Sequence, residues 1–208
     1  MDLLYVAPHQ IWPLSSGARL RDYQLARQLA ARGTITLVEM CSPYERYEAP
    51  PDDCGFTGTV TLHKDRMYTP SKIARGLKGP IPLTVLNCWS PQSASHLADV
   101  LRSRPFDTVQ IEGVHLMEYL PIIQDAPGSP AIVVDWHNIE SEMMWRFSKT
   151  TSNWAKKIAA RRTAKLIERA EDQLLYSSIM HTVTSERERQ KLLARVRRRE
   201  NRSQAKRL

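Results

Sequence analysis

The 208-residue sequence contains no apolar run that could cross a bilayer. A transmembrane helix needs about 20 consecutive apolar residues, and polar residues interrupt this chain long before that length. The first residues, 1–6, carry neither a basic leader nor a cleavage pattern, and they resemble a first strand instead. We therefore expect a cytoplasmic protein. Peripheral contact with the inner face of the membrane is compatible with this expectation.

Cysteine is scarce, and several catalytic signatures are missing. Cys41, Cys54 and Cys88 are odd in number and lie in no metal-ligand spacing, which indicates reduced thiols rather than a zinc site. There is no Gly-x-Ser-x-Gly, no Walker loop and no His-Glu-x-x-His. We expect neither a metal nor a cofactor, and no sequence repeat is present.

The excess positive charge lies at one end of the chain. The net charge is +8, but residues 186–208 hold ten Lys and Arg against three Asp and Glu, whereas residues 1–154 hold fourteen against sixteen. The segment from residue 194 onward has almost no apolar content, and we expect a disordered basic tail. Such a tail can contact anionic lipid; nucleic acid is a weaker alternative, because the near-neutral body shows no nucleic-acid-reading motif.

The rest of the chain alternates strands and helices. Apolar, β-branched runs predict strands over residues 2–8, 34–40, 108–113, 131–135 and 179–184, and a sixth strand over 59–63. Helical periodicity predicts helices over residues 19–32, 71–77, 93–104, 154–176 and from 186, with Ser185 and Glu188 at capping-box spacing. A strand, helix, strand order forces parallel, right-handed crossovers. The expected fold is a Rossmann-like α/β domain over residues 1–193, a parallel sheet with helices on both faces, followed by the tail at 194–208.

A polar cluster follows the strand at 131–135. It reads Asp-Trp-His-Asn-Ile-Glu-Ser-Glu over residues 135–142. Open α/β sheets bind ligands at the carboxyl ends of their strands, where imidazole, amide and carboxylate groups can contact sugar hydroxyls or move a proton. The alternative is structural: Asn138 or Ser141 caps the next helix.

Several segments in order resemble the N-terminal domain of family 4 glycosyltransferases of the GT-B fold, of the bacterial exopolysaccharide and lipopolysaccharide type. Residues 13–29 are similar to the glycine-bearing first loop and its helix, and residues 31–38 to the helix end and second strand. Residues 106–116 resemble the middle strand, residues 135–142 the Asp-Glu-His-Asn-Val-Glu-Ser segment, and residues 182–186 the strand before the domain hinge.

The resemblance implies one half of a two-domain enzyme. In that family the N-terminal domain holds the acceptor, and the C-terminal domain binds the nucleotide sugar. This chain departs at Ala18, where a second glycine is usual, and at Trp136, where an acid is common. It also lacks the family's paired glutamates and its Pro-Asn-Gly segment. A separate donor-domain subunit is therefore an expected partner.

The resemblance places His137 beside the donor sugar and the acceptor, so His137 is the predicted catalytic residue. The predicted substrate-binding residues come from the first loop and from the ends of two strands. They are Gly17, Arg19, Glu112, His115, Asn138 and Glu140. Arg19 and Arg21 can reach a nucleotide phosphate or an anionic acceptor; alternatively they are solvated arginines on a helix, an interpretation that fits Arg21 better. Gly17, Glu112 and the residues after position 136 have structural alternatives as a turn, a cap or an ion pair.

The predicted function is transfer of a hexose from a nucleotide sugar to a cell-surface polysaccharide or a lipid-linked acceptor. The chain alone is expected to be inactive. The alternative is a non-catalytic module that binds a sugar or a partner protein and is tethered to anionic membrane by its basic tail. The sequence does not identify the sugar, the acceptor, the stereochemical outcome or the oligomeric state.

Overall fold

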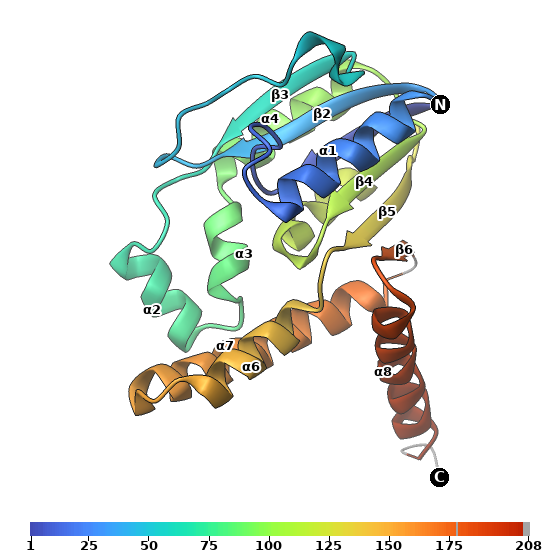
Figure 1. Ribbon diagram of the computed structural model, residues 1–208. Coiled ribbons are helices and arrows are strands. Elements are labelled where there is room, and N and C mark those ends of the chain that lie inside the picture. Colours follow the sequence, from blue (N-terminus) through green and yellow to red (C-terminus); the bar gives the residue numbers. More distant parts are fainter. Residues whose placement is uncertain (178, 206–208) are drawn as a thin grey trace.

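The computed structural model describes residues 1–177 and 179–205, and the side chains of these up to residue 198. Its centre is a six-stranded sheet in the order β3-β2-β1-β4-β5-β6, in which each neighbouring pair is parallel. Helices cover both faces of the sheet (Figure 1). The predicted fold class, a Rossmann-like α/β domain, is therefore confirmed.

The strands form where β-branched and apolar residues predict them. Their bounds are β1 (Asp2–Ala7), β2 (Thr34–Cys41), β3 (Gly58–His63), β4 (Thr108–Glu112), β5 (Ala131–Trp136) and β6 (Met180–Val183). β1 lies at the centre of the sheet, and its residues from Leu3 to Ala7 are all buried. A strand that is covered on both faces needs a continuous apolar run, and β1 has one.

The helices pack against this sheet and against each other. The longer ones are α1 (Gly17–Ala30), α2 (Pro70–Lys78), α4 (Pro91–Ser103), α6 (Glu140–Thr150), α7 (Trp154–Leu175) and α8 (Glu186–Ala205). Shorter ones are η1 (Asp52–Cys54), α3 (Leu83–Cys88), η2 (Val114–Tyr119) and α5 (Leu120–Gln124). The sequence predicted the longer helices except α6, which it offered only as the helix after a cap, and it missed α3, whose six residues are too short for a clear period.

Two apolar cores lie on opposite faces of the sheet. On one face, Tyr23 and Ala26 of α1 pack with residues of β1 and β2. On the other, Leu97 of α4, Tyr119 of η2 and Leu174 of α7 pack with β1, β4 and β5. α1 therefore covers this face together with Cys54 of η1, and the first turns of α1 reach the carboxyl end of β1, where the candidate site forms.

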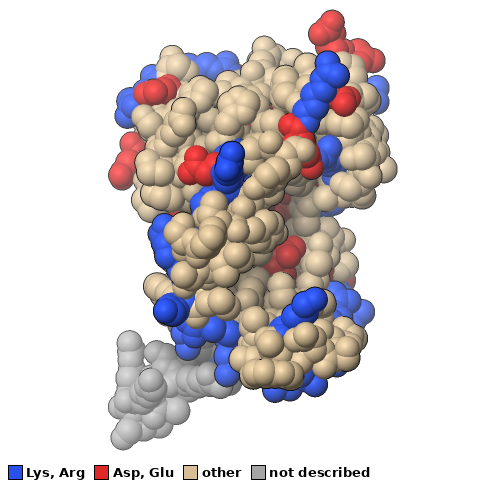
Figure 2. Space-filling view, turned by 90° about the vertical axis from the view of Figure 1, so that its left-hand side faces the viewer, with Lys and Arg blue, Asp and Glu red and all other residues tan. Residues whose placement is uncertain are grey.

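α6 and α7 form an antiparallel pair that projects away from the sheet (Figure 1). Asn153 caps α7 as predicted, since its side-chain oxygen accepts a hydrogen bond from Lys156 N at 3.0 Å. The predicted inner face of α7 is wrong at Ile158, which is 59% exposed. In the space-filling view, Lys and Arg predominate at the end that this pair forms with α2 (Figure 2).

Two further expectations are corrected. Neither Asn138 nor Ser141 caps α6: its N-cap is Ile139, and Ser141 instead donates its backbone N–H to Glu171 at 3.0 Å. Disorder was expected from residue 194 onward, but α8 continues as a helix to Ala205. Arg195 holds this helix in place by ion pairs to α7, and residues 206–208 of the predicted tail lie outside the described residues. In the described chain, no helix has the length and apolar character that crossing a membrane requires.

Candidate functional site

A small polar cavity lies where the order of strands reverses. The chain leaves β1 toward β2 on one side of the sheet and continues from β4 toward β5 on the other. This arrangement opens a crevice at the carboxyl ends of β1 and β4, the place where open α/β sheets bind ligands. The cavity there holds about 160 Å³ and is lined by Pro8, His9, Ala18, Glu112, Gly113, His115, His137, Asn138 and Glu140.

Buried carboxylates converge on one imidazole nitrogen at the wall of this cavity. His137 Nε2 lies 2.7 Å from Asp22 Oδ1 and 2.5 Å from Glu112 Oε2, and Asp135 Oδ2 lies 3.7 Å away. The three carboxylate side chains are almost completely buried. Each comes from a different element, since Asp22 lies in α1, Glu112 ends β4 and Asp135 lies near the end of β5.

His137 Nε2 has two carboxylate neighbours at hydrogen-bond distance. A single N–H at Nε2 can donate one full hydrogen bond, yet two carboxylate oxygens lie at hydrogen-bond distance from it. Burial raises the pKa of Glu112, and the charges of Asp22 and Asp135 raise it further, although the hydrogen bond from His137 opposes them. The pKa of Glu112 is thus raised, whereas that of Asp22 is lowered, so Glu112 takes up a proton more readily than Asp22 does.

His137 itself is held in its charged form. Burial alone would lower its pKa, but the hydrogen bonds and negative charges of Asp22 and Glu112 outweigh burial and raise the pKa to about 10. For Asp22, burial raises the pKa, and hydrogen bonds from His137 and His9 outweigh that effect and lower it. His9 Nε2 lies 2.8 Å from Asp22 Oδ2. At neutral pH, the cavity wall therefore presents an imidazolium backed by buried carboxylates.

Arg21 completes the charge balance beneath the cavity. Its guanidinium forms an ion pair with Asp135 and lies 3.9 Å from Glu112 Oε2. Burial would lower the pKa of Arg21, but Asp135 and Glu112 raise it, so the charge stays. Arg21 and His137 thus stand among three buried carboxylates, and His9 contacts one of these carboxylates from the other side.

His115 has the opposite protonation state. It follows the end of β4 within η2 and lines the same cavity. Burial lowers its pKa to about 4, and the positive charges of Lys64, His9 and His137 act in the same direction. His115 is therefore neutral at pH 7 and offers one ring nitrogen as an acceptor and one as a donor. A ligand in the cavity meets a neutral imidazole beside a charged one.

Asp22, Glu112 and His137 also have the donor types of a divalent metal site. One ligand atom from each lies within 4.8 Å of the other two. Metal–ligand distances of about 2.0–2.2 Å place neighbouring ligand atoms about 3 Å apart or more, because tetrahedral or octahedral angles separate them. The distances of 2.5 and 2.7 Å are those of hydrogen bonds, so an ion would have to displace the His137 proton and spread the ligands.

Five of the seven predicted site residues line this one cavity: Glu112, His115, His137, Asn138 and Glu140. Burial raises the pKa of Glu140, as does the charge of Glu171, while His137 lowers it. The predicted roles of these residues remain predictions, but their convergence is a structural fact.

The other two predicted residues lie outside the lining. Gly17 is the exposed first residue of α1, next to Ala18, and a Cβ atom there would meet nothing within 4 Å. Its position therefore does not require a glycine. Arg19 Nη2 contacts Glu45 Oε2 at 2.6 Å, so its guanidinium is paired with the loop that follows β2.

Sequence reasoning missed several residues of the charged cluster. Asp22 lies one helical turn before Ala26, on the buried face of α1, and this spacing was a usable signal. His9 follows β1 almost directly, as Glu112 and His137 end or follow their strands. Arg21, interpreted as solvated, is half-buried and paired with Asp135.

Comparison of the sequence with protein-family models gives no match, and comparison with curated proteins gives none either.

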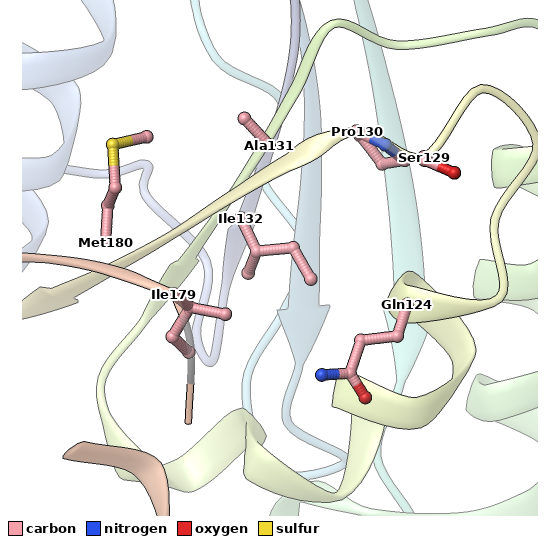
Figure 3. Close-up of a pocket in the computed structure, with 7 residues that line it drawn as sticks. All are labelled: Gln124, Ser129, Pro130, Ala131, Ile132, Ile179 and Met180. Atoms are coloured by element: carbon pink, nitrogen blue, oxygen red, sulfur yellow. The ribbon is translucent and has the colours of Figure 1, made fainter. Parts of the chain in front are cut away.

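A larger hollow of about 510 Å³ lies at the opposite, amino-terminal end of β5 (Figure 3). Its polar side chains are Gln124 and Ser129, and the remaining lining residues are proline or aliphatic, with Met180 at its rim. It contains no titratable side chain. The smaller cavity is therefore the better candidate for chemistry, because it combines donors, acceptors and charge at the carboxyl ends of the strands.

Proposed function

We propose that this chain is the acceptor-side domain of a glycosyltransferase, and that the cavity beside His137 holds a hexose unit of the acceptor. One observation carries the proposal. The resemblance to family 4 glycosyltransferases indicated residues at the ends of two strands. Glu112 ends β4 and His115 follows it, and His137, Asn138 and Glu140 follow β5. All five line a single cavity.

The size and chemistry of the cavity support a sugar ligand. About 160 Å³ is room for about five water molecules, the scale of a monosaccharide and not of a nucleotide. Neutral His115, the Asn138 amide and the Glu140 carboxyl group supply both donors and acceptors, as hydroxyl groups require. The bound hydroxyl groups would replace water without leaving buried polar groups unpaired.

The proposed role of His137 is to position the acceptor. Its Nε2 is engaged by Asp22 and Glu112, which fixes the ring and keeps it charged. A fixed cation at the wall can orient a hydroxyl group or an anionic part of the substrate by electrostatics. Transfer also needs donor phosphates held by a second domain, supplied either by further chain or by a separate subunit.

Titration of the isotope-labelled chain with methyl hexopyranosides, followed by amide NMR, tests the proposal. We expect shifts at Gly113, His115 and Asn138 with one or more hexosides, and weaker binding in His115→Phe. Asn87→Ser, at a buried position outside the lining, is the control. Absence of shifts at the cavity with every hexoside would contradict the proposal. Turnover of a nucleotide sugar by the chain alone would contradict the acceptor-side assignment.

A second candidate, a non-catalytic sugar-binding module, is favoured by the same ion-pair cluster. The cluster ties α1, β4 and β5 together, as a purely structural network would. The two candidates differ in one result: when a donor domain is supplied with its nucleotide sugar, only the glycosyltransferase transfers sugar to a bound hexoside.

A further inference from the structure

The helical pair α6–α7 and the neighbouring α2 expose large apolar side chains to water. Trp154 is 74% exposed and Ile158 is 59% exposed, one turn apart on α7. Ile73 and Leu77, one turn apart on α2, are 37% and 43% exposed. Isolated exposed apolar residues are ordinary, but pairs on adjacent helices mark an interaction surface.

Cations continue the same stripe of α7. Arg161, Arg162, Lys165 and Arg169 follow Ile158 at helical spacing, and together with Ile158 and Leu166 they line a shallow hollow of about 300 Å³. We call the surface formed by Trp154, Ile158, these four cations and α2 the basic face.

α2 adjoins α7 and adds to its charge. Arg162 Nη2 donates to the backbone oxygen of Gly79, the residue that caps α2, at 3.2 Å. Arg75 and Lys78 in the last turn of α2 are exposed. Figure 2, which looks onto this side of the molecule, shows Lys and Arg around the lower end and most Asp and Glu in the upper half.

Acidic residues are absent from the sequence of this surface. Residues 70–78 contain no Asp or Glu, and α7 has none before Glu168. In the part of the chain whose side chains are described, the ion pairs involve none of Arg161, Arg162, Lys165 and Arg169. The charge of the basic face is thus left for an external anion.

We propose that the basic face docks on an anionic lipid bilayer, with Trp154 and Ile158 inserted at the interface and the cations of α7 against the lipid headgroups. A tryptophan beside apolar and basic residues is suited to the headgroup region, where one part of the ring is apolar and another is wet. Each cation near an anionic surface strengthens binding about fivefold. Nucleic acid would also bind the cations, but it offers no apolar environment for the side chains of Ile73, Leu77 and Ile158.

This proposal goes beyond the proposed sugar function and assigns membrane contact to a surface other than the tail. The test is cosedimentation of the full chain with phosphatidylcholine vesicles and with vesicles that also contain phosphatidylglycerol. We expect binding to the second kind alone. Trp154→Ser should weaken it about tenfold or more, and the pair Arg161→Gln/Lys165→Gln about twenty-five-fold, since two cations are removed.

Control variants, two for charge and one for the aromatic ring, localise the effect. Arg27→Gln/Arg32→Gln removes two exposed cations, one in the last turn of α1 and one just after that helix, and Arg197→Gln/Arg198→Gln removes two exposed cations of α8. Both controls should bind as the original chain does. Tyr44→Ser removes an aromatic side chain that is 65% exposed outside the basic face, and it should also be without effect.

Bromine-labelled lipids separate insertion from surface attraction. They should quench part of the tryptophan fluorescence of the bound chain, and Trp154→Ser should lose that part. Four results would overturn the proposal: no binding to anionic vesicles, binding unchanged in the variants of the basic face, loss of binding in the α8 control, or binding to a soluble polyanion such as polyphosphate without binding to vesicles. None of them bears on hexoside binding at the cavity.

Discussion

Substitution of Arg195 by alanine tests whether the C-terminal helix is docked. Arg195 Nη1 contacts Glu171 Oε2 at 2.7 Å, and Nη2 contacts Asp172 Oδ1 at 2.6 Å. The Glu171 side chain is completely buried, and that of Arg195 is 15% exposed. Loss of one partner from a buried ion pair costs about 3–5 kcal/mol, because the remaining charge is left without compensation.

The expected loss is smaller, about 2–3 kcal/mol, for two reasons. Ser141 continues to donate its N–H and hydroxyl group to Glu171, and water can reach the space that Arg195 leaves. Urea unfolding followed by circular dichroism measures this loss. With a urea dependence of about 1–3 kcal/mol per molar, the midpoint should fall by about 1 M or more.

Arg198→Ala is the matched control, because Arg198 is exposed on the same helix and should change stability by less than about 0.5 kcal/mol. Equal stability of the two variants would refute the docking of α8 and would restore the disordered tail that the sequence predicted. A double-mutant cycle with Glu171→Gln should show coupling of about 1–2 kcal/mol between the two residues.

Three further predictions concern the site and the caps. The raised pKa of His137 stabilises the fold below pH 6.5, so the free energy of unfolding should fall as pH rises from 6.5 toward about 10, and His137→Gln should remove this slope in urea titrations. Gly17→Ala should leave the thermal midpoint equal or slightly higher, whereas Gly113→Ala should lower the stability by about 1 kcal/mol or more, since Gly113 has φ +69°. Asn153→Ala should cost about 1 kcal/mol by the same measurement, because α7 loses its N-cap hydrogen bond.

The fold could be predicted because its signals are local. Apolar runs such as that of β1, and the helical period of α1 and α7, come from residues that are near in sequence. The parallel arrangement follows from the crossover rule, and the strand order then places the crevice. The sequence failed where a distant partner decides the structure. The composition of the tail predicts disorder, but the buried carboxylate of Glu171, 24 residues before Arg195, binds that helix.

The site could be predicted in part for the same reason. Glu112, His137 and their neighbours were found because they end or follow strands, and parallel strands bring their carboxyl ends together. Asp22 was missed because it belongs to a helix whose buried face was judged from apolar residues alone. The ion pair of Arg19 with Glu45 could not be foreseen, because Glu45 lies in a loop that no periodic pattern describes, and the substrate-binding role of Arg19 stays a prediction.

The length of α6 relates the cavity to the basic face. α6 begins at Glu140, in the cavity wall, and ends at Thr150, shortly before Trp154. Its 11 residues rise about 16 Å, so the cavity lies about that far from the Trp154 end of the pair, measured along the helix. If both proposals hold, an acceptor attached to a lipid beside Trp154 must span about this distance to reach His137.

Hexosides attached to a lipid through spacers of increasing length test this geometry. In anionic vesicles, protection of the cavity from hydrogen exchange at Gly113 and His115 should rise with spacer length and level off once the extended spacer reaches about 16 Å, because the tethered sugar then acts at high effective concentration. The same hexosides without lipid should show no such dependence on spacer length. Equal protection by short and long spacers would contradict a separation between the cavity and the bilayer, even where vesicle binding and hexoside binding are each observed.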